Sequence, residues 1–255
     1  MYRGEVRAWI LLLVAGCGRF GFSDAPTVDA ARMLDAAVDD APDAATFSVE
    51  GVTRYAMDDD PAGGVIASPQ LPATCTTCPT ATIGVHGGGY LFDGNAVFQL
   101  PSTGLVTAAP YSIAVWFRLD QPTSPGSGRS MVNKPFGDTA ATNVANLLVM
   151  NDNLPSFETT TDGVANDYLS AVGGVNLGAW HHAAVTWDGT TKQLYLDGAL
   201  ARSTPATVAD SNLPVQVGAD RDYGVNIYPW IGALDDLQFY SRALTGAEMD
   251  VSDGG

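Results

Sequence analysis

The segment Cys75-Thr-Thr-Cys78 holds a pair of side chains whose spacing could support chemistry. Two cysteines this close can form a disulfide, act as a redox dithiol or supply half of a zinc site. A redox pair needs its first cysteine at a helix N-terminus, but Pro72 and Pro79 flank the pair and no helix is predicted after it. Zinc would need two further ligands, and only His86 is near in sequence. We therefore expect a local disulfide that stiffens a loop and has no catalytic part.

Carboxylate pairs suited to acid–base hydrolysis are not evident from the spacing of acidic residues. The sequence has four glutamates, Glu5, Glu50, Glu158 and Glu248, and neither Glu50 nor Glu158 has a carboxylate two residues further on. No Gly-x-Ser-x-Gly motif is present. We predict a protein that is not an enzyme. The alternative is a glycan-active enzyme whose aspartates are paired only by the fold.

The segment 220–230 combines aromatic rings with carboxylate, amide and guanidinium groups. Sugars stack on aromatic rings while planar polar groups bind their hydroxyls, and loops on a rigid scaffold commonly carry such sites. We therefore predict ligand contacts from Asp222, Tyr223, Asn226, Tyr228 and Trp230. The alternative is that Tyr228 and Trp230 pack into the core as part of the last strand.

The N-terminus combines the positive charges of Arg3 and Arg7 with a short apolar run, Trp9–Ala15, which ends in Gly16-Cys17. The run is too short for a stable membrane span. Small residues before a cysteine resemble the bacterial lipobox. This implies a signal peptide over residues 1–16, removed before Cys17, and acylation of Cys17. An ordinary signal peptide cut elsewhere is the alternative.

A lipid anchor at Cys17 implies a location in the cell envelope. Gly18 follows the cysteine, where an inner-membrane retention signal usually has Asp, and this favours the outer membrane of a Gram-negative source, on its periplasmic face or at the cell surface. Such a compartment is oxidising, which again favours a disulfide between Cys75 and Cys78.

Residues 17–46 consist of the cysteine followed by a stretch that repeats Asp, Ala and Pro. Such a segment buries too little apolar surface to offset its ordering entropy, so we predict an extended acidic tether. A short helix over 30–38 is the alternative, although an isolated helix of that length is marginal in water. The net charge of −16 argues against nucleic acid as a partner, because phosphate binding needs a basic face.

Short segments of alternating apolar and polar residues, punctuated by Gly, Pro, Asn and Asp, extend from about residue 48 to residue 240. A two-residue period is typical of β-strands, and pairs such as Asp93-Gly94 and Asp197-Gly198 are typical of hairpin turns. These features indicate an all-β sandwich. Trp116 and Trp187 are expected to pack between its sheets.

Several of these segments together resemble the laminin G-like family of concanavalin A-like domains. The segments are Tyr55–Asp58, Gly89–Phe98, Tyr111–Arg118, Trp180–Gly198 and Gly232–Met249, in the order of the family. The resemblance implies a two-sheet antiparallel jelly-roll sandwich over residues 47–250, followed by a short tail over 251–255. It also implies a binding module for carbohydrate or for a glycosylated or extracellular protein. A structural envelope or adhesion protein without a small ligand is the alternative.

Members of this family often hold a structural calcium ion where the first and last strands are neighbours. Asp58, Asp60 and Asp235 are the acidic residues at these positions, and calcium prefers oxygen ligands of this kind. Strand alternation predicts that Asp235 shares the inward face of Leu237 and Phe239. The alternative is that Asp58–Asp60 is a solvated loop and that Asp235 accepts hydrogen bonds from backbone amides.

Overall fold

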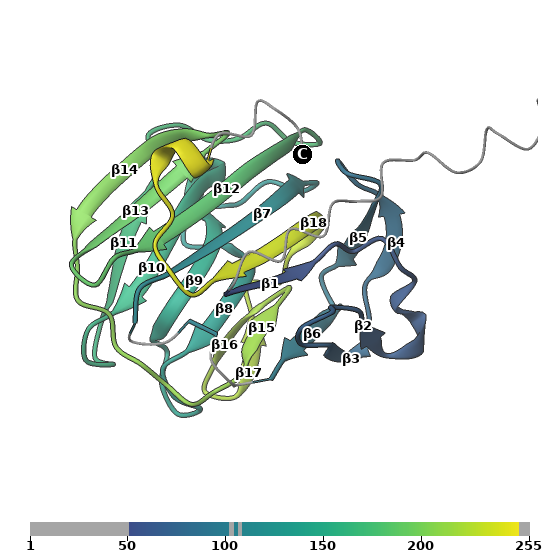
Figure 1. Ribbon diagram of the computed structural model, residues 1–255, viewed down its shortest axis with the longest axis horizontal. Helices are drawn as coiled ribbons and strands as arrows, with labels where there is room; N and C mark the ends of the chain where they lie inside the picture. Colours follow the sequence, from purple (N-terminus) through teal and green to yellow (C-terminus); the bar gives the residue numbers. More distant parts are fainter. Residues whose placement is uncertain (1–50, 102–104, 107–108, 250–255) are drawn as a thin grey trace, which may run out of the picture. The chain divides into compact units, whose positions relative to one another are not determined.

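The computed structural model describes residues 51–101, 105–106 and 109–249. Within these residues, two antiparallel sheets lie face to face, and a small third sheet of two strands accompanies them (Figure 1). The three short helical turns are all of the 3-10 type, at Pro61–Gly63 (η2), Asn151–Asn153 (η3) and Gly246–Met249 (η4). The predicted all-β, two-sheet sandwich is confirmed.

The first sheet has the order β14-β13-β12-β7-β18-β5-β4, and β1 pairs with β18 beside this path. Its strands are β1 (Val52–Tyr55), β4 (Thr80–Ile83), β5 (Gly88–Asp93), β7 (Tyr111–Leu119), β12 (Trp180–Trp187), β13 (Thr191–Leu196), β14 (Ala199–Pro205) and β18 (Ile231–Tyr240).

The second sheet has the order β11-β10-β9-β8-β15-β6-β3-β2. Its strands are β2 (Val65–Ile66), β3 (Ala73–Thr77), β6 (Val97–Leu100), β8 (Arg129–Pro135), β9 (Asn143–Met150), β10 (Leu154–Thr160), β11 (Asn166–Ser170) and β15 (Val215–Val217). The third sheet is a hairpin of β16 (Asp220–Asp222) and β17 (Val225–Ile227).

The core lies between the two large sheets and follows the two-residue period of the strands. On β7 the side chains of Ile113, Val115 and Phe117 point into it, and all three are fully buried. Trp187 at the end of β12 is 4% exposed and belongs to the same cluster, as predicted.

Trp116 lies on the opposite face of β7, so the prediction that it packs between the sheets is wrong. Its neighbours Val115 and Phe117 occupy the inward positions, and alternation turns the indole outward. The ring lies between those of His86 and His182, with centroid separations of 5.8 and 5.2 Å. The alternation of side chains along β7 was predicted correctly, but the inward face was assigned to the wrong set of residues.

Asp235 also lies on the outward face, because the strand β18 is irregular at this point. The pairing of β18 with β7 shifts register between Asp235 and Gln238, and Asp236 has a positive φ of 48°. One extra residue in a strand reverses the alternation that follows it. Leu234 and Leu237 therefore both face the core, while Asp235 pairs in register with Trp116. The prediction that Asp235 shares a face with Leu237 is wrong for this reason.

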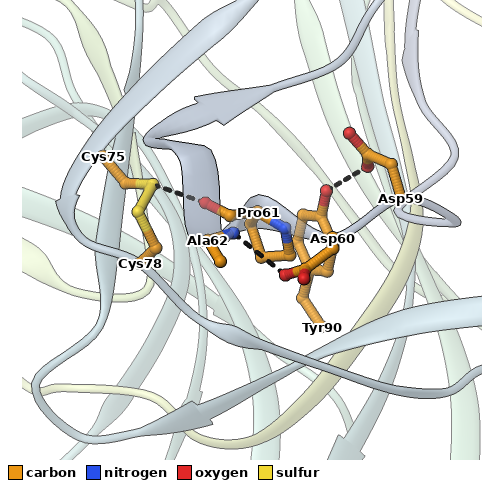
Figure 2. Close-up of a disulfide and its surroundings, with 7 residues drawn as sticks. All are labelled: Asp59, Asp60, Pro61, Ala62, Cys75, Cys78 and Tyr90. Carbon is orange, nitrogen blue, oxygen red and sulfur yellow. Dashed lines mark hydrogen bonds between the residues drawn. A yellow bond between two sulfur atoms is a disulfide. The ribbon is translucent and has the colours of Figure 1, made fainter.

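Cys75 and Cys78 form the predicted disulfide, at the point where the chain leaves β3 in the second sheet and turns toward β4 in the first (Figure 2). The Sγ atom of Cys75 lies 3.9 Å from the carbonyl oxygen of Pro61, which begins the turn η2. Asp60 caps this turn, since its Oδ1 accepts a hydrogen bond of 3.0 Å from the amide of Ala62. The disulfide thus lies against a capped turn, an environment that suits a structural role.

The predicted signal peptide, the acylation site Cys17, the tether over 17–46 and the tail over 251–255 lie outside the described residues. Within the described part of the chain, no helix is long and apolar enough to cross a membrane.

Candidate functional site

The outward face of the second sheet carries a row of polar side chains that runs across six strands in register. Each member is the cross-strand partner of the next: Tyr168 on β11, Glu158 on β10, Asn146 on β9, Asn133 on β8, Gln216 on β15 and Gln99 on β6. Amide and carboxylate groups in such a row can donate and accept hydrogen bonds along a line perpendicular to the strands.

The hairpin β16–β17 lies beside β8 and β15, the strands that carry the middle of this row (Figure 1). Its turn consists of Tyr223 and Gly224, with φ values of 49° and 76°. A two-residue turn with both φ values positive matches the right-handed twist of the flanking strands, and glycine makes the second position easy to occupy. The turn places Tyr223 at the tip of the hairpin, where its side chain is 66% exposed.

A buried network of carboxyl and amide groups attaches the hairpin to the sheet. Asp220 accepts hydrogen bonds from the Nδ2 atoms of Asn133 (2.9 Å), Asn143 (3.2 Å) and Asn146 (2.8 Å). Glu158 accepts from the same Nδ2 atoms of Asn143 (2.9 Å) and Asn146 (3.2 Å). Two carboxyl groups from strands β10 and β16 therefore share two amide donors, and each is only 2% exposed.

Burial raises the pKa of both carboxyl groups, because the charged form loses its hydration. The pKa of Glu158 rises to about 7, and the hydrogen bonds from Asn143 and Asn146 oppose the shift. The pKa of Asp220 rises to about 8, and the neighbouring charge of Glu158 adds to the effect of burial. Near neutral pH the pair therefore retains protons. This pair is not apparent from the spacing of acidic residues along the chain.

Further contacts fix the hairpin from both sides. The amide of Tyr223 donates to the carbonyl of Ala140 over 3.2 Å, and the guanidinium of Arg221 forms an ion pair with Asp138 at 3.1 Å. The Nε2 atom of Gln216 donates to Oδ1 of Asn226 over 3.0 Å. The tip of the hairpin is thus held at a defined position.

A shallow depression of about 410 Å³ lies beside the tip, at the edge of the second sheet. Its lining is formed by two short segments and two tyrosines: residues 139–142, residues 163–166, Tyr168 and Tyr223. Tyr168 is 47% exposed and stands at the end of the polar row. The depression therefore offers two phenol rings and uncharged polar groups, which suits a ligand with both apolar faces and hydroxyl groups.

The structure separates the five residues predicted to bind a ligand. Tyr223 lines the depression, and Asp222 precedes it with one buried oxygen, Oδ1, that has no hydrogen-bond partner. Asn226 is exposed but its amide oxygen is bound to Gln216, and Tyr228 is 36% exposed. Trp230 is fully buried and packs edge-on against Phe117 at 5.9 Å, so its ring cannot stack on a ligand and its prediction is wrong.

Tyr168 and the segments 139–142 and 163–166 line the depression but were not predicted from the sequence. Tyr168 belongs to a predicted strand, but its position beside Glu158 depends on strand register. Register between distant segments has no signal in the spacing of residues along one chain.

The three aspartates predicted to bind calcium do not surround one point. Asp235 accepts hydrogen bonds at Oδ2 from the amides of Val85 (2.7 Å) and His86 (3.0 Å), and Asp58 accepts from Gly88 (2.6 Å). These two carboxylates hold the loop that carries His86, whereas Asp60 caps η2. Burial raises the pKa of Asp235, and the two backbone hydrogen bonds oppose this.

Among the described residues, no group of three or more His, Cys, Asp or Glu side chains is arranged to hold a metal ion. Asp235 fits the alternative of a carboxylate that accepts bonds from backbone amides. Calcium binding by Asp58, Asp60 and Asp235 stays a prediction.

The geometry of the sandwich agrees with a comparison of the sequence with known families. The family described as the concanavalin A-like lectin/glucanases superfamily matches residues 92–250, more than half of the chain. The chain belongs to this superfamily. No curated protein sequence matches it significantly.

Several solved structures resemble this domain in fold but only weakly in sequence. Domain 4 of AbnA, a GH43 extracellular arabinanase from Geobacillus stearothermophilus in complex with arabinotriose, has a TM-score of 0.61 and 17% identity, and covers 79% of this chain and 98% of that one. The binding domain of Paraclostridial Mosquitocidal Protein 1 has a TM-score of 0.61 and 13% identity, with coverage of 79% and 50%.

Trypanosoma rangeli sialidase has a TM-score of 0.57 and 11% identity, and the alignment covers 78% of this chain but only 32% of the sialidase. This chain thus spans about half of the mosquitocidal structure and about a third of the sialidase. At such low identities the likeness shows the fold alone.

Proposed function

We propose that this concanavalin A-like domain is a carbohydrate-binding module, and that it binds sugar in the depression between Tyr168 and Tyr223. The observation that carries the proposal is the pair of exposed phenol rings beside an uncharged polar lining. A pyranose or furanose ring presents C–H groups on its faces and hydroxyls on its edge, and both kinds of partner are present here. The volume of about 410 Å³ falls within the range of about 300–1,000 Å³ that is usual for ligand sites.

The structural neighbours support this class of ligand. Domain 4 of the arabinanase was solved with arabinotriose, and its whole length aligns with this domain. A separate small domain that carries a glycan site is therefore known on this fold.

A glycosylated extracellular protein fits the same proposal, because its glycan would occupy the depression. A structural envelope protein without a small ligand is the competing proposal, and it expects no sugar binding at all.

The site of action that we propose is the cell envelope. The lipobox-like segment that ends at Cys17 would anchor the protein to the outer membrane, and the acidic tether would extend the domain away from the lipid. Replacement of Cys17 by Ser should abolish labelling by radioactive palmitate and leave the unprocessed precursor. Normal labelling of that variant would remove this part of the proposal.

A glycan-active enzyme is a second candidate, and the Glu158–Asp220 pair is the observation that favours it. Acid–base hydrolysis uses pairs of carboxyl groups, one with a raised pKa, and burial raises the pKa of both Glu158 and Asp220. Both groups, however, are 2% exposed and lie under the hairpin, so a polymer would have to displace β16–β17 to reach them. We therefore propose that the domain is not catalytic. Release of reducing ends by wild-type protein that is lost in Glu158→Gln would reverse this conclusion.

Calorimetric titration of the purified protein with a panel of oligosaccharides, arabinotriose among them, tests the binding proposal. Replacement of Tyr223 by Ala should weaken binding roughly two- to tenfold, because an aromatic contact is worth about 0.5–1.5 kcal/mol. Val225→Ala is the matched control, since Val225 is on the same hairpin, is 61% exposed and does not line the depression. Equal affinity of the Tyr223 and Val225 variants would refute the site.

A further inference from the structure

The distribution of charged side chains around the depression indicates which kind of sugar it can bind. The lining itself has no charged side chain: it consists of Thr, Ala, Gly, Val, Asn and Tyr residues. An ionic group on the ligand would therefore have no partner in direct contact.

The rim, in contrast, is acidic. Three aspartates, Asp138, Asp162 and Asp222, are immediate chain neighbours of lining residues. Asp167 also adjoins Tyr168 in the chain, but it lies on the opposite face of β11 and pairs with Lys192 of the first sheet, so it is not part of the rim. Adjacent Cα atoms are about 3.8 Å apart, so the backbone of each aspartate lies within a few ångströms of the lining. Negative charge is thus concentrated where a ligand would approach.

The cation on this rim is already paired. Arg221 contacts Asp138 through Nε at 3.2 Å and Nη2 at 3.1 Å. Lys192 is fully buried on β13 of the first sheet and does not reach the rim. Asp162 and Asp222 are therefore without a basic partner among the described residues. Asp162 accepts only a backbone hydrogen bond, from the amide of Val164.

A third cation lies further along β11. Arg202 on β14 donates from Nε to the carbonyl of Ser170 over 3.2 Å, beyond Tyr168 in the direction away from the segment 163–166. It does not line the depression.

We propose that the depression selects uncharged glycans and discriminates against those that carry carboxylate or sulfate groups. This inference rests on the proposed function and specifies the ligand class of the same site. An anionic sugar would meet Asp162 and Asp222 with no free cation to compensate, and leaving ionised groups unpaired is unfavourable. A cationic sugar would find no carboxylate in the lining. A neutral sugar needs only the hydroxyl and ring contacts that the lining offers.

The test uses glycan pairs that differ only in an acidic group: lactose with sialyllactose, galactotriose with trigalacturonate, and arabinotriose as a further neutral probe. The purified protein is titrated with each in about 0.15 M salt, where charges interact over about 8 Å. If the charges of Asp162 and Asp222 lie about 8 Å from the acidic group of the sugar, their repulsion should weaken binding of the acidic member roughly fivefold before screening by salt. Saturable binding of at least one neutral member, with its acidic counterpart weaker, is the expected result.

Charge reversal at the rim identifies the cause. Asp162→Lys changes an exposed side chain that does not contact the ligand in this geometry, and it should leave the affinity for the neutral member within about twofold. The same variant should strengthen binding of the acidic member roughly two- to fivefold, and the gain should shrink as salt is raised. Asp93→Lys, at the end of β5 in the first sheet, is the matched control, because Asp93 is also exposed and accepts backbone hydrogen bonds; it should change neither affinity.

The outcomes separate this inference from the proposed function. Tighter binding of the acidic member by wild-type protein, with loss of binding in Tyr223→Ala, would overturn the charge inference and leave the carbohydrate site intact. An unchanged preference in Asp162→Lys would overturn the assignment to the rim. Absence of binding to every member of the panel would overturn both.

Discussion

Replacement of Glu158 by Gln should change the pH dependence of stability in a direction that the buried carboxyl pair determines. In the folded protein the pKa of Glu158 is about 7, against 4.5 for the unperturbed group. Since the folded-state pKa is raised, the native state holds its proton after the unfolded state has lost it. The stability that Glu158 contributes is therefore full below about pH 4.5 and is lost as the pH rises toward 7.

The size of the loss follows from the shift. A difference of about 2.5 pKa units corresponds to roughly 3 kcal/mol, at about 1.4 kcal/mol per unit. Gln imitates the protonated carboxyl group and does not titrate, so the variant should escape this loss. The free energy of unfolding of Glu158→Gln, relative to wild type, should thus rise by roughly 3 kcal/mol between about pH 4.5 and pH 8. Coupling to Asp220 means that the measured step belongs to the pair.

Urea unfolding followed by tryptophan fluorescence, at intervals from about pH 4.5 to pH 9, measures this difference. All other groups except the coupled Asp220 titrate alike in both proteins, so their contributions cancel. Glu248→Gln is a control that should show no step over this range, because Arg242 lowers the pKa of Glu248 to about 2 and its contribution is lost only at a pH below the range. A difference between wild type and Glu158→Gln that stays constant within about 0.5 kcal/mol over the range would refute the account of the buried pair.

Three further predictions concern the scaffold. Trp187→Ala should cost about 3–5 kcal/mol in urea unfolding and Trp116→Ala clearly less, and equal costs would contradict their opposite faces. Asp235→Asn should lower the melting temperature equally with calcium and with chelator, whereas a calcium-dependent difference would favour the metal. Thiol counting on denatured protein should find no free thiol at Cys75 or Cys78, and Ser at both positions should cost roughly 2 kcal/mol.

The local pattern along the chain was sufficient for several features. Alternation of apolar residues predicted the strands, and Asp-Gly pairs predicted turns, because both depend on residues within a few positions of one another. The Cys75–Cys78 bridge was predictable for the same reason, since its partners are three residues apart. A two-sheet sandwich then followed from the number and shortness of the strands.

The faces of individual strands were less predictable. A period of two defines which residues share a face but not which face is the core, and Trp116 was placed on the wrong one. An irregular step at Asp236 also reverses the alternation within β18, and nothing in Gly232–Tyr240 signals it. Asp235 is consequently bound to backbone amides on the outward face.

By itself, the sequence determined the fold class, the disulfide and the acidic character of the protein, because these depend on composition and on near neighbours. Of the two Asp-Gly pairs expected at hairpin turns, Asp197-Gly198 forms one, but Asp93-Gly94 joins strands of different sheets, so that prediction was wrong. Only the tertiary structure decided the site. Glu158 and Asp220 are 62 positions apart in the chain. Strand register and the docking of one hairpin bring them to the same amide donors. The same two events place Tyr223 beside Tyr168 and bury Trp230. Register and docking are set by the packing of whole sheets, whose energy is distributed over residues far apart in the chain.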